Sequence, residues 1–179
     1  MKSGKAAILF FMIFGFLVVS GGALADSAMP GAQPPAYEEL FEGFVYYADS
    51  QKTALKSEKR WFSSSLDFHE LGKQILTTLI EGPSQVPHQA TWPSDTKIKA
   101  FFITDSGDAF VDLDVNDEKI ENMDTLCEFL AVYSMVNSLT LNIAKIKQVK
   151  ILIQGKDAKT LAGHIGLEHF YRTNMLIVK

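Results

Sequence analysis

Histidine side chains are the residues of this chain whose type and spacing come nearest to a metal site. His69 stands beside an acidic residue at the start of a predicted helix, but no second histidine follows four residues later, as a zinc protease helix requires. Segment 164–169 (His-Ile-Gly-Leu-Glu-His) resembles the inverted zinc motif, with three residues instead of two between its first His and its Glu. Gly163 and Gly166 also oppose a helix there. We therefore expect His164 to bond backbone groups in a C-terminal turn.

A group of acidic residues suggests calcium binding. Asp112, Asp114 and Asn116 have the spacing of the first half of a calcium loop. The sixth position, however, holds Asp117 where glycine is required, and the twelfth holds Met123 where glutamate is required. Apolar residues alternate with these acids, so a half-buried strand with one water-facing side explains the spacing better.

Candidate nucleophiles are few. The serines at 63–65 have no nucleophile-elbow context and no obvious base. Cys127 is the single cysteine, and its place beside Leu126 and Leu130 on a predicted helix indicates a buried, inert thiol. One cysteine also excludes a disulfide framework and a multi-cysteine metal site. We expect no catalytic residue, no cofactor and no metal ligand.

The N-terminus has the pattern of a secretory leader. Two lysines among the first five residues precede an apolar run over residues 6–19, and Ala-Leu-Ala at 23–25 ends just before Asp26. The pattern predicts a signal peptide over residues 1–25. An uncleaved signal anchor is the alternative, since residues 6–25 are just long enough to span a bilayer.

Charge and composition describe the remaining chain. Without the leader, 15 basic side chains face 21 acidic ones, a net charge of −6. With no basic cluster, the chain lacks the electrostatic pattern of a nucleic-acid-binding protein. Proline and small residues indicate a tether over residues 26–42. One folded domain is predicted over residues 43–179.

Two helices are predicted between strands. Asp67 is suited to cap the first helix, and Gly82 followed by Pro83 ends it. The second helix spans about residues 122–139. The buried stripes are predicted at Phe68, Leu71, Ile75 and Leu79, and at Met123, Leu126, Leu130, Tyr133, Val136 and Leu139.

Six segments have the apolar or alternating character of strands. The first five, together with the helices, predict an α+β fold in the order β-β-α-β-β-α-β, in which both helices pack on one face of a mixed sheet. The last segment is expected to be an edge strand. The six are 44–47, 53–62, 97–104, 109–115, 150–153 (with Val149 in front) and 174–178.

Five short segments, in this order along the chain, resemble the GerMN domain, a module named after the sporulation and germination protein GerM. They lie within residues 43–170, so the resemblance covers nearly all of the chain beyond the leader. The segments are 79–83 (LIEGP), 109–113 (AFVDL), 133–140 (YSMVNSLT), 149–155 (VKILIQG) and 161–165 (LAGHI).

The resemblance implies an extracytoplasmic, non-enzymatic module whose fold is similar to the ring-building motif of secretion and sporulation complexes. It therefore implies protein–protein assembly at the cell envelope, with envelope proteins or with itself. Several relatives carry a lipid-anchoring cysteine near the leader, and this chain does not. The motif residues are interpreted as structural: Gly82, Pro83, Ser134, Asn137, Thr140, Gly155, Gly163 and His164.

Two functional hypotheses stay open. The first is an interaction module whose contact surface bears Trp92, in the loop 83–95, together with Asp112 and Asp114. In this hypothesis Trp92 is solvent-facing, although it fits a lid over the core equally well. The second is an envelope hydrolase, or a protein that binds a metal or small ligand through His164, His169 and the acidic hairpin.

Overall fold

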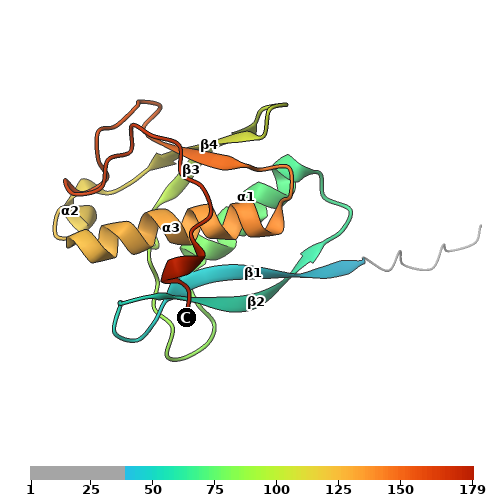
Figure 1. Ribbon diagram of the computed structural model, residues 1–179, viewed down its shortest axis with the longest axis horizontal. Helices are drawn as coiled ribbons and strands as arrows, with labels where there is room; N and C mark the ends of the chain where they lie inside the picture. Colours follow the sequence, from blue (N-terminus) through green and yellow to red (C-terminus); the bar gives the residue numbers. More distant parts are fainter. Residues whose placement is uncertain (1–38) are drawn as a thin grey trace, which may run out of the picture. The chain divides into compact units, whose positions relative to one another are not determined.

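The computed structural model describes residues 39–179, which form an α+β domain (Figure 1). Two sheets enclose a middle layer of two helices. Strands β1 (Leu40–Ala48) and β2 (Leu55–Ser63) form an antiparallel pair. The second sheet has the order β3-β4-β5, in which β3 is antiparallel and β5 parallel to β4. Its strands are β3 (Lys97–Ile103), β4 (Asp108–Asp114) and β5 (Gln148–Ile153).

The helices occupy the space between the sheets. Helix α1 (Phe68–Glu81) packs against β3 and β1, and α3 (Thr125–Asn142) packs against β1, β5 and α1. A one-turn helix, α2 (Asp117–Ile120), precedes α3 and was not predicted. A 3₁₀ turn, η1 (Met175–Ile177), lies near the C-terminus.

The predicted fold class is confirmed, with both long helices on one face of the mixed sheet. The structure adds that β1 and β2 form a separate sheet on the other side of the helices (Figure 1). Segment 174–178 is not an edge strand, which corrects the prediction. It forms η1, and within residues 39–179 its only strand pairing is an isolated bridge between Val178 and Leu55.

The predicted domain boundary needs a small correction. Strand β1 begins at Leu40, so the last residues of the predicted tether 26–42 belong to the first sheet. The predicted signal peptide 1–25 and the rest of the tether lie outside the described residues. Between residues 39 and 179, no helix has the length and apolar character that a membrane crossing requires.

Helix α1 is bounded as its sequence predicts. The Asp67 carboxylate accepts hydrogen bonds from the N–H groups of His69 and Glu70, at 2.8 and 2.9 Å. Gly82 follows the helix with φ at 96°, a conformation that favours glycine. Phe68, predicted to be buried, is instead about half exposed.

Helix α3 is buried on more sides than a single stripe predicts. Leu130, Val136 and Leu139 are buried as expected, but Leu126 is 43 % exposed. Buried polar side chains also line the helix, because it runs along the free edge of β1. Ser138 Oγ accepts a hydrogen bond from Tyr46 N–H at 3.0 Å. These bonds satisfy backbone groups that a sheet edge otherwise leaves open.

Candidate functional site

Glu128 is a fully buried carboxylate in the first turn of α3. Its Oε1 accepts hydrogen bonds from the N–H groups of Leu161 and Ala162, at 3.0 and 2.8 Å. Its Oε2 accepts one from the N–H of His164 at 2.9 Å and lies 3.0 Å from His164 Nδ1. Burial alone would raise the pKa of Glu128, but these donors outweigh it and lower the pKa. The imidazole of His164 thus bonds a carboxylate, not the backbone group that we expected.

Glu58 on β2 makes a similar arrangement with the loop after α1. Its carboxylate accepts hydrogen bonds from the N–H and hydroxyl of Ser84, at 2.9 and 2.6 Å, and lies 3.2 Å from His88 Nδ1. Arg60 forms a salt bridge with the same carboxylate. Burial by itself raises the pKa of Glu58, but the donors and the positive charge of Arg60 outweigh it and hold the pKa at about 2.

A carboxylate–histidine pair is the supporting part of a nucleophilic triad, which also needs a hydroxyl or thiol at the histidine. Within residues 39–179, neither His88 nor His164 forms a side-chain hydrogen bond with a serine, threonine or cysteine. Nor do three His, Cys, Asp or Glu side chains of this part of the chain gather where they could hold a metal ion. His164 and His169 therefore form no assembled site with the acidic hairpin, and both buried acids serve to hold loops.

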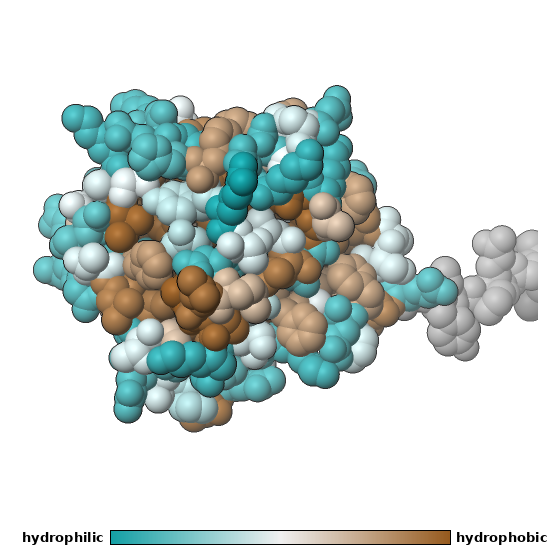
Figure 2. Space-filling model, in the orientation of Figure 1, coloured by the Kyte–Doolittle hydropathy of each residue, from teal (hydrophilic) through white to brown (hydrophobic). Residues whose placement is uncertain are grey.

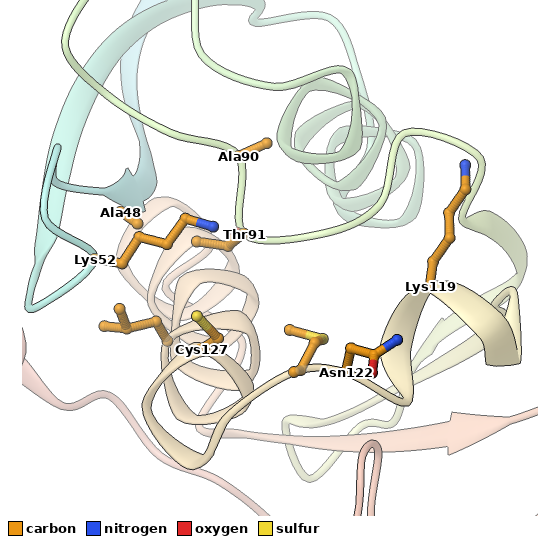
Figure 3. Close-up of a pocket in the computed structure, with 9 residues that line it drawn as sticks. Ala48, Lys52, Ala90, Thr91, Lys119, Asn122 and Cys127 are labelled. Atoms are coloured by element: carbon orange, nitrogen blue, oxygen red, sulfur yellow. The ribbon is translucent and has the colours of Figure 1, made fainter.

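Cys127 lines a pocket of about 240 Å³ between α3, the turn after β1 and the loop before β3 (Figure 3). Lys52 reaches toward Thr91 over this pocket, and Lys119 lies at its far side, paired with Asp95 at 2.9 Å. The thiol is half-buried and not enclosed, which corrects the prediction of a buried cysteine. Burial and the nearby carboxylate of Asp124 raise its pKa, so the thiol is protonated and weakly nucleophilic near neutral pH.

Trp92 is not a surface residue, which corrects its assignment to the interface. Its side chain is 3 % exposed, and Nε1 donates a hydrogen bond to the Ala131 carbonyl at 2.9 Å. The preceding residue, Thr91, is also fixed on α3, because its Oγ1 lies 2.7 Å from Ser134 Oγ. Trp92 is therefore the lid over the core that was the alternative interpretation.

The acidic strand is confirmed as half-buried. Along β4, buried Ala109, Val111 and Leu113 alternate with partly exposed residues. Asp112 Oδ1 accepts a hydrogen bond from Gly155 N–H at 2.6 Å, so this acid closes the turn after β5. Asp114 lies on the same partly exposed side, and Trp92 does not join these acids in one exposed surface.

The other motif residues contact loops or occupy turns. Both amide atoms of Asn137 bond the backbone of Asn174, each at 2.9 Å. Thr140 Oγ1 accepts a hydrogen bond from the Thr173 hydroxyl at 2.8 Å. The three glycines have positive φ: Gly82 at 96°, Gly155 at 74° and Gly163 at 100°. Pro83 directly follows Gly82.

Sequence reasoning missed an exposed aromatic residue on β2. Trp61 is 62 % exposed and lies opposite Glu42, while Leu40, two residues before Glu42, is 53 % exposed. Because opposite residues share a face, Leu40 and Trp61 both project from the outer side of the β1–β2 sheet. We call this surface the Trp61 face. No alternation in the sequence of β2 marks this face, because the buried Glu58 looks like a surface acid among its polar neighbours.

Figure 2 shows a second gathering of apolar side chains, over the C-terminal turn η1. Leu176 is 94 % exposed and Met175 is 52 % exposed. Ile177 and Val178, the next residues, pack against Tyr46 and Leu130. This patch is thus the outer surface of the segment that covers the buried end of β1.

Comparison with known proteins gives a family match and structural neighbours. A family model described as Germane, "Sporulation and spore germination", matches residues 44–159. No curated protein sequence matches the chain.

Three solved structures share the fold. The first GerMN domain of the sporulation protein GerM from Bacillus subtilis has a TM-score of 0.56 and 20 % identity, over 76 % of this chain and 98 % of that one. The tandem GerMN domains of the same protein have a TM-score of 0.59 and 21 % identity, over 75 % of this chain and 46 % of that one. A "putative lipoprotein" from Clostridium perfringens has a TM-score of 0.53 and 22 % identity, over 79 % and 91 %.

Proposed function

The chain belongs to the Germane family of sporulation and spore-germination domains, and we propose that it is an exported, non-catalytic module that binds another protein at the bacterial cell envelope. The leader pattern of residues 1–25 supports export. A sporulation protein and a "putative lipoprotein" among the structural neighbours support an envelope location. The implied similarity to ring-building motifs supports assembly with another protein.

The Trp61 face is the observation that carries this proposal. Tryptophan is the side chain that most often dominates binding energy at protein interfaces, and burying one exposed indole removes a large apolar area from water. Trp61 has Leu40 diagonally across the strand pair, and the two together form an apolar centre.

Charged groups border this apolar centre. Lys59 Nζ lies 3.1 Å from Glu42 Oε2 on the same outer face, and both side chains are substantially exposed. An apolar centre with a charged rim is the usual composition of a non-obligate protein interface. The exposed outer face of a two-stranded sheet is also better suited to another protein surface than to a small substrate, which requires a concave site.

Photo-crosslinking tests the proposal in cells that produce the full chain. The photoreactive residue replaces Trp61 in one variant (Trp61→p-benzoylphenylalanine) and Val86 in the matched control (Val86→p-benzoylphenylalanine). Val86 is 95 % exposed in the loop after α1. We expect a discrete protein adduct from position 61 and none from position 86. Equal adduct patterns, or no adduct from position 61, would overturn the proposal.

A binding measurement complements the crosslinking. The purified partner should bind the Trp61→Ala variant at least about tenfold more weakly than the unmodified protein. The melting temperature should be unchanged, because Trp61 is largely exposed. Unchanged affinity in the Trp61→Ala variant would remove this face from the interface.

A further inference from the structure

We propose that a groove between α1 and the outer edge of β3 binds an extended acidic segment of a partner protein, which adds a strand to β3. The α1–β3 groove is formed by two adjoining hollows of about 450 and 390 Å³, which share Thr77 and Ile98. The α1–β3 groove includes none of the residues of the Trp61 face, so this inference goes beyond the proposed function. An experiment that disproves one of the two binding surfaces would leave the other unaffected.

The outer edge of β3 has free backbone groups. The N–H of Ile103 donates to His69 Nε2 at 3.3 Å, on the side away from β4. Because alternate residues of an antiparallel strand direct their backbone groups to the same side, the N–H and C=O of Phe101 also face that edge. Within residues 39–179 no backbone or side-chain partner bonds these groups of Phe101.

Two other edges of the domain, those of β5 and β1, are covered by its own atoms. At β5, Val149 and Tyr171 exchange two backbone hydrogen bonds of 2.8 Å each. At β1, the Asn142 side chain bonds the N–H and C=O of Phe44, at 2.9 and 2.6 Å. The open stretch of β3 therefore differs from these two edges, and an open edge is the site at which an extended peptide adds a strand.

Helix α1 forms the side of the groove that faces β3. Gly72 lets the helix approach β3 closely, since a Cβ atom at this position would lie 2.0 Å from the Phe101 ring. Thr77 of α1 then borders both hollows, opposite Ile98 of β3. Side chains at alternate positions of an added strand are about 7 Å apart on one face, a spacing suited to two adjoining hollows.

The charges of the groove favour an acidic segment. Lys73, Lys97 and Lys99 line it, against the single carboxylate of Glu81. None of the three lysines forms a salt bridge with a carboxylate of the described part of the chain. A positive groove attracts and orients a segment that carries Asp or Glu.

Thr96 adds a hydroxyl group without a hydrogen-bond partner to the lining of the groove. It is 6 % exposed, and its Oγ1 is the only buried side-chain polar atom among residues 39–179 without a hydrogen-bond partner. The hollow next to Lys97 is bordered by this residue. A buried hydroxyl without a partner is uncommon, because leaving it unbonded has a free-energy cost.

The test uses a fluorescent ten-residue peptide of alternating Glu and Val, compared with a peptide of alternating Lys and Val. We expect saturable binding of the acidic peptide to the full chain. The Lys99→Glu variant should bind it at least about tenfold more weakly. The matched control Lys159→Glu reverses an exposed charge in the loop after β5 and should bind normally. The Trp61→Ala variant should also bind normally, which separates this site from the Trp61 face.

Hydrogen exchange tests the added strand directly. The peptide should slow exchange of the Phe101 amide hydrogen, whereas an ion pair with the lysines alone would leave it unchanged. Three results would overturn the proposal: no saturable binding, equal binding of the lysine peptide, or unchanged exchange at Phe101. A self-associated dimer that the Lys99→Glu variant no longer forms would assign the groove to a second copy and overturn the proposal as well.

Discussion

Glu128 at the start of α3 and His164 in the C-terminal segment form a bonded pair: Oε2 of the acid lies 2.9 Å from the backbone nitrogen of the histidine and 3.0 Å from its Nδ1. The acid side chain is fully buried, while the imidazole is 41 % exposed. The carboxylate therefore serves mainly as a shared acceptor for the turn at 161–164. It ties the chain after β5 to the middle layer of the fold.

Replacing this acceptor should destabilise the domain. In Glu128→Gln, an amide N–H₂ meets N–H groups that need an acceptor, so the free energy of unfolding should fall by about 1–3 kcal/mol. The matched control Glu121→Gln changes an exposed acid and should stay within about 0.5 kcal/mol. Urea midpoints of both variants measure the difference. Equal midpoints would show that the 161–164 turn does not depend on this carboxylate.

Stability should fall in acid through Glu58. Its folded pKa of about 2 lies below the ordinary value of about 4.3, so the unfolded state binds more protons between these two values. The stabilisation is fully present above about pH 5 and is lost as pH falls toward 2. Urea midpoints at pH 6, 4 and 3 should decline. The decline should be smaller in Glu58→Gln, and an equal decline would assign the acid sensitivity to other groups.

Local patterns in the sequence were sufficient for the individual elements. Asp67 and Gly82 mark the ends of α1, because capping and a positive φ depend on neighbouring residues only. The alternation around Asp112 identified β4 for the same reason. These features need no knowledge of what packs against them.

Features that depend on distant partners were not recoverable. Glu58 and Glu128 look like surface acids in the sequence, and their donors lie 26 to 36 residues further along the chain. The sequence also did not show whether Trp92 is buried or exposed, because the α3 carbonyl that its indole bonds lies 39 residues away. The separate β1–β2 sheet also escaped prediction, since strand periodicity does not specify which strands pair.

Two leucines of α3, Leu130 and Leu126, provide a matched comparison of a buried and an exposed position. Leu130 is 1 % exposed and packs against Tyr46, Ala48 and Leu55, so Leu130→Ala should lower the free energy of unfolding by about 2–5 kcal/mol. Leu126, on the same helix, is 43 % exposed, and Leu126→Ala should cost less than about 1 kcal/mol. Denaturant midpoints check both values. Similar losses would mean that the buried side of α3 is placed incorrectly.

The leader should be cleaved after Ala25 in cells that export the protein. Charged residues, a short apolar run and small residues at positions 23 and 25 are the features that signal peptidase requires. Intact-mass measurement should find a chain that begins at Asp26. A bulky residue in Ala25→Tyr should leave the leader attached. Met1 retained on unmodified protein in the membrane fraction would indicate a signal anchor.

Trp92 should act on stability and not on association. Trp92→Ala removes a buried indole and its hydrogen bond to Ala131, so it should lower the free energy of unfolding by about 3–5 kcal/mol. Trp92→Phe keeps an aromatic ring and loses the N–H donor, so its loss should be smaller. Trp61→Ala is the exposed counterpart, with an expected change within about 0.5 kcal/mol. Thermal unfolding and partner binding of all three variants separate the roles. If Trp92→Phe kept full stability but lost the partner, Trp92 would be an interface residue after all.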